Sequence, residues 1–593
     1  MIQDPAPKLP LRVLFFQEGK DLAGNYYKNS PGLLPMIDDV RKRGFNISFY
    51  IDGEQLLKDC LDPGVDVVAI STVERQLART VELARKIREV GYSSVLMIGG
   101  KTINHYIEKL SQELFDITVG EEGEHIFPAL LYKISAWRGK GPNTIGLTPE
   151  KLYPSQITRL ENGETGGAID DQGIGFLLDA SFERLGCRIG ISNVCVRNGK
   201  TGEVYRFNPP KTETIENNLK LDCCPDEYEL QHMFNIPWDI MTQYGWKTLE
   251  IYTQRGCSWS RCVFCSISKT PVRSLTHENI LCAVRVAADQ GITSVSFADD
   301  MFIQDSTWSR GLLESLIESH TGIRFRAQTC PTKAVWKLLD SMAQAGFDEL
   351  SYGVETLLGD RAVFLGKSNN GAKYVENAKA TILRTASAGI IPVLYMILVD
   401  PRSSLEEITL DLLECAKLLS DVYHRTSVLP KISWSLVLLP VSGGMLGKEF
   451  SFSTTAVNLG NRSFGVPSDY DLPEILAVLI RKIVQTTEGL PSGRDSFETL
   501  EGLLIAARDV SREFNLDQAY QNALEGLEIY HGLRKSLLSD IMMTAEEVYE
   551  VQMNPDPDWW HDPAMMRFNY LRFASFQEGL EKYVGLIQNH KMT

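Results

Sequence analysis

Short apolar runs alternate with helix-like segments over most of this chain, and this alternation is its strongest constraint on the fold. The first third contains five such runs, at residues 12–17, 45–51, 65–72, 94–100 and 115–124. Between them lie segments with helical spacing of apolar residues, such as Arg75 to Val90. Strands that alternate with helices form parallel sheets, so we predict a doubly wound α/β domain over residues 1–140.

A second series of strand candidates occupies residues 246–450, at 247–253, 294–300, 324–330, 348–356, 391–400 and 432–440. Helical segments separate them, which predicts a partial (β/α)6 barrel with its chemistry at the carboxyl ends of the strands. Residues 141–245 read as a connecting segment with a hairpin turn at Asn198-Gly199. Residues 451–593 are mostly helical by pattern and predict a helical C-terminal domain.

Bulk composition narrows the class of protein. A chain of 593 residues predicts several domains, and a formal charge of −16 disfavours a nucleic-acid partner, whose binding surface would be basic. No apolar run is long enough to span a bilayer, and the first residues lack the apolar core of a secretory signal. Eleven cysteines without such a signal indicate reduced thiols. We therefore expect a cytoplasmic protein with neither a membrane nor a nucleic-acid partner.

Three cysteines, Cys257, Cys262 and Cys265, follow the first strand of the second series on one loop. Thiolates this close repel one another unless a metal takes up their charge. Three ligands would hold an iron–sulfur cluster and leave one iron open, whereas closed clusters and structural zinc sites take four protein ligands. Zinc is the alternative, with His277 as the nearest downstream histidine.

Small and polar residues follow the strands of the first domain, where open α/β sheets bind ligands. These loops contain Ser71 to Arg75, Gly99-Gly100 and Gly120 to Gly123. Ordinary turn chemistry is the alternative, because glycines often end strands. The G-x-G-x-x-G fingerprint is absent after the first strand, so a nicotinamide cofactor is not favoured.

Polar side chains also end the strands of the second series. Asp299 and Asp300 end the second strand, Gln328 the third and Glu355 the fourth. The carboxyl ends of parallel strands lie at one edge, so these residues are candidates for one binding site. The alternative for the two aspartates is a helix N-cap pair.

The segments "RGC…CVFC", "FADDMF", "YGVET…FLGK" and "GIIPVLYMILVDP" resemble a radical S-adenosylmethionine (AdoMet) domain. With the preceding domain, residues 10–450 resemble the cobalamin-dependent radical AdoMet family, many of whose members are C-methyltransferases. This sequence departs from the family at one point. The usual C-x3-C-x2-C spacing is C-x4-C-x2-C here, which could alter the exposure of the cluster.

The resemblance implies roles for the residues of the second series. The three cysteines would hold a [4Fe–4S] cluster, and the open iron would bind the amino and carboxylate groups of AdoMet. Phe264 would contact the adenine, and Asp299 or Asp300 the amino group or ribose. Gln328 would bind AdoMet or face substrate, and Glu355 would contact AdoMet or support the site.

The resemblance also implies a cobalamin site in the first domain. The D-x-H-x-x-G motif is missing, so cobalamin would bind base-off without histidine ligation. Arg75 would approach the lower face of the cobalt, where its charge would favour Co(I), unless it pairs with the next helix. The other expected contacts are Ser71, Thr72, Val73, Gly99, Gly100, Glu121, Glu122 and Gly123.

The implied reaction moves a methyl group from AdoMet via methylcobalamin to a carbon of a small molecule, such as tryptophan, or of a peptide natural-product precursor. An external donor such as flavodoxin or ferredoxin would supply electrons. A radical rearrangement or cyclisation is the alternative among enzymes. A cobalamin or redox sensor is the alternative from another class.

Overall fold

The computed structural model describes a large part of the chain, in two compact units. One unit comprises Met1–Thr253 with Arg273–Ala298, and the other comprises Gln254–Val272 with Asp299–Thr593. The described residues are 10–17, 33–72, 77–100, 110, 114–120, 123–140, 156–160, 168–170, 172, 177, 181–184, 187–190, 194–208, 236–265, 272–400, 402–437, 454–459, 462–467, 474–487 and 497–553.

The first unit contains an eight-stranded sheet in the order β2-β1-β3-β4-β5-β9-β10-β6. Its first five strands pair in parallel: β1 Arg12–Gln17, β2 Asn46–Tyr50, β3 Val67–Ser71, β4 Val95–Gly100 and β5 Ile117–Gly120. The parallel α/β prediction is confirmed. The sheet then continues antiparallel through β9 Val194–Arg197, β10 Val204–Asn208 and β6 Gln156–Leu160, an extension that we did not predict.

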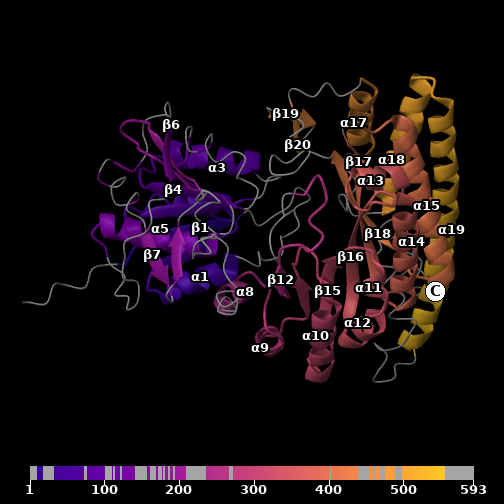
Figure 1. The fold of residues 1–593 in the computed structure, drawn as a ribbon, viewed down its shortest axis with the longest axis horizontal. Coiled ribbons are helices and arrows are strands. Elements are labelled where there is room, and N and C mark those ends of the chain that lie inside the picture. The colour runs from indigo at the N-terminus through magenta and orange to yellow at the C-terminus, as the bar shows by residue number, and fades with distance from the viewer. Residues whose placement is uncertain are drawn as a thin grey trace, which may run out of the picture. The chain divides into compact units, whose positions relative to one another are not determined.

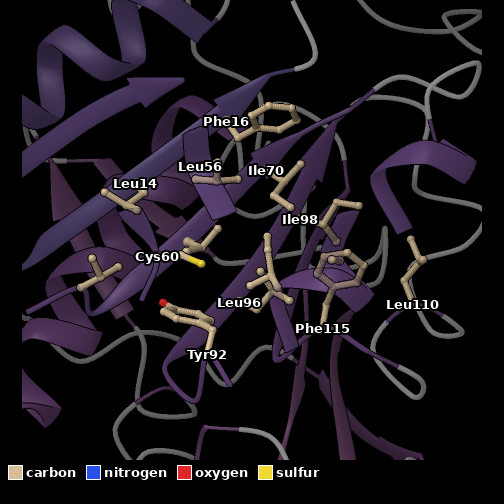
Figure 2. Packing of buried hydrophobic residues seen from close by; sticks show 14 residues of the cluster. Leu14, Phe16, Leu56, Cys60, Ile70, Tyr92, Leu96, Ile98, Leu110 and Phe115 are labelled. Carbon is tan, nitrogen blue, oxygen red and sulfur yellow. The ribbon is translucent and has the colours of Figure 1, made fainter. Parts of the chain in front are cut away.

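Helices lie between these strands in sequence (Figure 1), and each contributes buried apolar side chains. They are α1 Leu33–Lys42, α2 Gly53–Asp59, α3 Leu77–Glu89 and α5 Gly123–Trp137. Asp52 starts α2 by accepting hydrogen bonds from the amides of Glu54 and Gln55. Figure 2 shows the resulting core, in which Leu14, Phe16 and Ile70 from the strands pack with Leu56 and Cys60.

The hairpin predicted at Asn198-Gly199 is confirmed, but its turn is wider than two residues. Arg197 pairs with Val204, so the connection contains residues 198–203. The side chain of Asn198 accepts hydrogen bonds from the amides of Lys200 and Thr201, at 2.9 and 3.2 Å. Asn198 therefore begins the turn as an Asx motif.

The six strands predicted for residues 246–450 all form. In the first unit, β11 Thr248–Ile251 pairs in parallel with β14 Ser294–Phe297, and α9 His277–Asp289 lies between them in sequence. In the second unit, β15 Arg324–Thr329, β16 Phe347–Glu355, β17 Ile391–Val399 and β18 Lys431–Val437 form consecutive parallel pairs. The intervening helices are α10 Ser306–Ser319, α11 Lys333–Trp336, α12 Leu339–Ala345, α13 Gly359–Phe364, α14 Gly371–Ser387 and α15 Leu405–Thr426.

The described residues of the C-terminal part are helical as predicted, apart from one hairpin. The helices are α17 Glu474–Thr487, α18 Phe497–Glu513 and α19 Asp517–Met553, and α18 and α19 pack beside α15 (Figure 1). Gly526 permits close packing, because a Cβ there would lie 2.7 Å from Leu504 Cδ2. The hairpin of β19 Thr454–Leu459 and β20 Arg462–Pro467 was not predicted. Within the described segments, no helix combines the length and hydrophobicity needed to cross a membrane.

Candidate cluster and cofactor sites

The three motif cysteines lie on the loop after β12 Gln254–Arg255, and each is partly exposed. No three His, Cys, Asp or Glu side chains of the described residues converge closely enough to share one metal ion. A cluster does not require such convergence, because each thiolate binds a different iron of the cube. Three cysteines on one loop could each bind one iron of such a cluster. His277, considered as a zinc ligand, is the first residue of α9.

The residues between Cys257 and Cys262 form several contacts that fix the conformation of the longer loop. Ser260 adopts a left-handed conformation with φ of 46°, and its hydroxyl donates to the carbonyl of Cys257 at 2.5 Å. The Trp259 indole thereby reaches the carbonyl of Gly366, to which it donates at 2.9 Å. The guanidinium of Arg261 lies over the same ring, 5.2 Å from its centroid. Trp259 thus docks the longer loop on the segment after α13.

Gln304 connects the cysteine loop to the strand ends, a role that sequence reasoning missed. Its amide nitrogen donates to the Gly256 carbonyl at 2.9 Å, and its amide oxygen accepts from the Ser258 amide at 2.7 Å. Two residues earlier, the Phe302 amide donates to the carbonyl of Gln328 at 2.8 Å. The segment after Phe297 therefore fixes the start of the cysteine loop against the end of β15.

The predicted polar residues at these strand ends differ in accessibility. Asp299 is fully buried, and its carboxylate accepts from the Gln254 amide at 3.0 Å. Gln328 is half-buried, and its side chain donates to the Asp300 carbonyl at 3.5 Å. The N-cap considered for Asp299 and Asp300 is instead Asp305, whose carboxylate accepts from the first amides of α10. Asp299 thus stabilises the start of the motif loop.

Glu355 ends β16 in a strained conformation. Its φ is 67°, and the pairing of β16 with β17 shifts register between Gly353 and Glu355. A left-handed backbone is uncommon for a residue with a side chain, and such strain is concentrated at functional sites. The carboxylate lies 3.5 Å from the ammonium of Lys367, and the two side chains are 13% and 5% exposed. Lys367 is a site residue that sequence reasoning missed.

Burial and neighbouring charges shift the pKa values of the ionisable groups in this site. Burial raises the pKa of Cys262 to about 12, with Cys330 and Cys265 adding to the effect and Lys367 opposing it. Burial also raises the pKa of Cys330, which lies near Cys257 and the same lysine. Burial raises the pKa of Glu355 as well. A cation at this site, such as the iron of a cluster, would favour the thiolate form of Cys262.

Phe264, predicted to contact adenine, lies in a small apolar cluster. Its neighbours there are Val263, Phe364, Leu365 and Ile397, of which the last two are fully buried. The Val263 amide also donates to the Leu365 carbonyl at 3.2 Å. The loop between the second and third cysteines therefore docks against the segment after α13.

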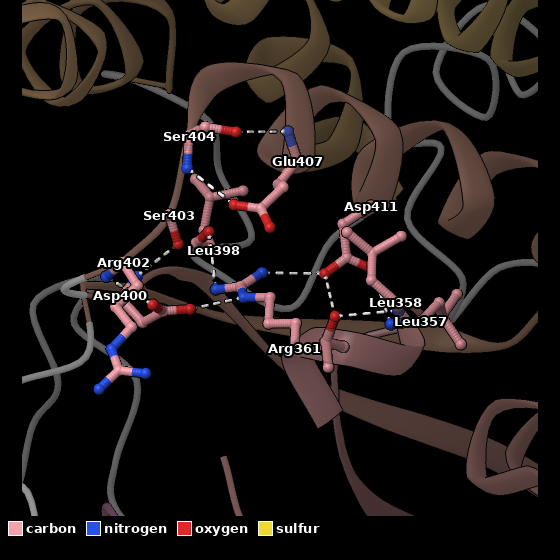
Figure 3. A network of polar contacts seen from close by, with 11 residues as sticks. Leu357, Leu358, Arg361, Leu398, Asp400, Arg402, Ser403, Ser404, Glu407 and Asp411 are labelled. Carbon is pink, nitrogen blue, oxygen red and sulfur yellow. Dashed lines mark hydrogen bonds and ion pairs between the residues drawn. The ribbon is translucent and has the colours of Figure 1, made fainter. Parts of the chain in front are cut away.

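A buried ionic network fixes the chain just beyond Glu355 (Figure 3). Arg361 donates to Asp400 at 2.6 Å, to Asp411 at 2.9 Å and to the Leu398 carbonyl at 3.1 Å. Asp411 also accepts from the Thr356 hydroxyl at 2.6 Å and the Leu357 amide at 2.7 Å. The network joins α13, α15 and the ends of β16 and β17, and so orients the segment that follows Glu355.

In the first unit, the carboxyl edge of the parallel sheet is poor in side chains. Ser71 of β3 lies opposite Gly99 of β4, and Gly100 lies opposite Gly120 of β5. Gly100 has φ of 149°, and a Cβ there would lie 2.0 Å from the Thr72 carbonyl oxygen. Thr72 is buried and shares a hydrogen bond of 2.8 Å with Thr80. Only a glycine at position 100 permits this close approach of β4 to the backbone that follows β3.

Only one of the other residues predicted to bind cobalamin at this edge lies within the described residues. Gly123 is the first residue of α5, directly after the loop that follows β5. Val73, Glu74, Arg75, Glu121 and Glu122 lie outside the described residues. The roles expected for them, including that of Arg75 near a cobalt, stay predictions.

Residues 251–413 match the radical SAM superfamily, in which SAM is AdoMet. No curated protein sequence matches the chain. This segment is a radical SAM domain, which agrees with the resemblance stated from the motifs.

Solved structures with a similar fold agree with this class. The chain resembles TsrM from Kitasatospora setae, a radical AdoMet methyltransferase that was solved with tryptophan and aza-SAM. The TM-score is 0.52 at 13% identity, and the match covers 84% of this chain and 89% of TsrM. A second TsrM structure contains cobalamin and a [4Fe–4S] cluster, and matches with a TM-score of 0.50 at 13% identity over 74% of each chain. OxsB, a cobalamin-dependent AdoMet radical enzyme with aqua-cobalamin bound, matches with a TM-score of 0.50 at 15% identity over 95% of this chain and 84% of OxsB. The chain therefore has the fold of these enzymes.

Proposed function

We propose that this protein is a cobalamin-dependent radical AdoMet C-methyltransferase. The observation that carries the proposal is the occurrence, in one chain, of a radical SAM domain with a three-cysteine loop and a parallel sheet with a glycine-lined carboxyl edge. TsrM and OxsB, which were solved with cobalamin bound, share this fold.

The residues of the second unit support the cluster half of the proposal. Cys257, Cys262 and Cys265 would hold a [4Fe–4S] cluster, which supplies a Lewis-acidic iron for AdoMet and can donate an electron. Gln304 and Trp259 hold both sides of the cysteine loop in place. Phe264 would offer an apolar surface to adenine, and Gln328 and Glu355 would offer polar groups at the strand ends.

The carboxyl edge of the first unit supports the cobalamin half. Cobalamin, when bound, would carry a methyl group from AdoMet to the substrate carbon. Gly99 and Gly100 would bring the backbone of β4 close to the corrin, and Ser71 and Thr72 would border it. Because the histidine motif is missing, cobalamin would bind at this edge in the base-off mode without a histidine ligand.

The similarity to TsrM suggests a class of substrate for this protein. TsrM was solved with tryptophan, so an electron-rich aromatic carbon of an amino acid or of a peptide precursor is the first candidate. An external electron donor such as flavodoxin or ferredoxin would keep the cobalt and the cluster reduced. A rearrangement or cyclisation is the second candidate, because OxsB, a cobalamin-dependent AdoMet radical enzyme, shares the fold.

Product analysis separates the two candidates. The protein is reconstituted without oxygen to about four irons and one cobalamin per chain, then given tryptophan and AdoMet with a ¹³C-labelled methyl group. Methyl transfer yields a product in which one labelled methyl group has replaced a hydrogen on carbon, together with S-adenosylhomocysteine. Formation of 5′-deoxyadenosine and a product without the label would overturn the proposal in favour of rearrangement. The variant Cys257→Ala is the control without an intact cluster site.

A further inference from the structure

Lys367 is a buried cation beside the cysteine loop. It follows α13, its residue is 7% exposed, and its amide donates to the Ala362 carbonyl at 3.0 Å. Its ammonium lies 3.5 Å from the carboxylate of Glu355. A Cβ on Gly353 would lie 3.3 Å from this ammonium and 2.8 Å from the Glu355 carboxylate, so the pair packs against the end of β16. A lysine is seldom so deeply buried unless it is paired, and Glu355 is the partner here.

The cysteine loop holds the residues before Lys367 from two sides. Leu365 accepts from the amide of Val263 at 3.2 Å, and Gly366 accepts from the indole of Trp259 at 2.9 Å. At Gly366, with φ of 72°, a Cβ would lie 2.2 Å from the Arg261 carbonyl oxygen and 3.3 Å from Cys262 Cα. Only glycine permits this approach. The lysine is therefore held next to the second motif cysteine by backbone contacts.

The groups around the Lys367 ammonium include Tyr374, Glu355 and two cysteines. Tyr374 directs its hydroxyl to the carbonyls of Gly353 and Val354, at 3.2 and 2.9 Å, so its proton is used elsewhere. Burial by itself lowers the pKa of Lys367, but Tyr374, Cys330, Glu355 and Cys262 outweigh it and raise the pKa. Lys367 is ion-paired with Glu355 and follows directly on Gly366, the residue packed against Cys262.

A fixed ammonium near a cluster acts on its redox equilibrium. Reduction adds negative charge to a cluster that three thiolates already make electron-rich, and a nearby cation stabilises the reduced form. The interaction is strong where water is excluded. We propose that Lys367 is a positioning residue that raises the reduction potential of the cluster, and that Glu355 partly offsets it. This proposal rests on the cluster of the proposed function, but not on methyl transfer.

The test is the midpoint potential of the reconstituted full-length protein, from a redox titration followed by electron paramagnetic resonance. Lys367→Met should lower the midpoint, Lys367→Arg should retain it, and Glu355→Gln should raise it. The control Lys373→Met removes an exposed lysine of α14, which pairs with Glu376, and should leave the potential unchanged. Iron content is measured for every variant.

Unchanged potentials in both Lys367→Met and Glu355→Gln, at full iron content, would overturn the proposal. If Lys367→Met fails to hold iron, Glu355→Gln decides, because that variant keeps the lysine and must raise the potential. The titration needs neither substrate nor turnover. A protein that fails to transfer methyl groups can therefore still confirm the role of Lys367. The proposal on the cluster potential and the proposal of methyl transfer are thus tested independently.

Discussion

Replacement of Arg361 by methionine should destabilise the second unit more than any surface change. The guanidinium is 4% exposed, and its partners Asp400 and Asp411 are 2% and 1% exposed. Removal of one member of a buried ionic network leaves the opposite charges without a partner, at a cost of about 3–5 kcal/mol. Because Asp411 also binds Thr356 and Leu357, the loss should reach the segment that follows Glu355.

The deficit of Arg361→Met should also depend on pH. Burial raises the pKa of Asp411 even though Arg361 opposes this effect, so removal of Arg361 raises it further. A carboxyl with a raised folded pKa favours folding at low pH and loses that contribution as the pH rises through the folded pKa. The destabilisation should therefore be largest at neutral pH, and should shrink as the pH falls toward about 4, the unfolded aspartate value.

Equilibrium urea unfolding of wild type and variant, at neutral and acidic pH, measures both effects. The matched control is Arg425→Met on α15, which breaks a pair whose side chains are 58% and 55% exposed. An exposed pair contributes at most about 1 kcal/mol. An Arg361→Met protein that unfolds like this control at neutral pH would refute the reasoning about the buried network.

Three further predictions concern the cofactor sites. Gly366→Ala should reduce iron incorporation, since the new Cβ would meet Arg261, whereas Gly389→Ala, at φ of 77° with open space, should bind iron normally; equal iron contents would contradict the docking of the loop. Gly100→Ala should abolish the absorption spectrum of bound cobalamin, and Gly91→Ala, with nothing within 4 Å, should not; a normal spectrum in Gly100→Ala would exclude this edge. Alanine at Cys257, Cys262 or Cys265 should remove the cluster, while Cys330→Ser should keep about four irons per chain; iron loss confined to Cys330→Ser would reassign the ligands.

Sequence reasoning predicted the elements whose signal is local. The run RVLFFQ predicted β1 because a strand covered on both faces is apolar throughout, and the residues Val13 to Phe16 are buried. The hairpin of β19 and β20 was missed, although the Gly460-Asn461 dipeptide between its strands is a known two-residue turn signal. The antiparallel extension through β9 had no local signal, since partner choice depends on tertiary packing.

The sequence predicted the site residues that lie at strand ends. It did not predict the residues whose position depends on packing between distant segments. The three cysteines and Glu355 follow strands, which placed them at one edge. Lys367 lies twelve positions beyond Glu355, and its approach depends on contacts between Gly366 and a loop about a hundred residues earlier. Likewise, no pattern connects Arg361 with Asp400 and Asp411, whose pairing requires the packed helices.

The most direct test of the central claim is the fate of AdoMet in the cobalamin-loaded, cluster-loaded protein with a low-potential electron donor. Mass spectrometry compares the S-adenosylhomocysteine released by this protein with that released by protein reconstituted without cobalamin. A cobalamin-dependent methyltransferase forms S-adenosylhomocysteine only when cobalamin is bound. Release of 5′-deoxyadenosine alone, or the same amount of S-adenosylhomocysteine without cobalamin, would contradict the account.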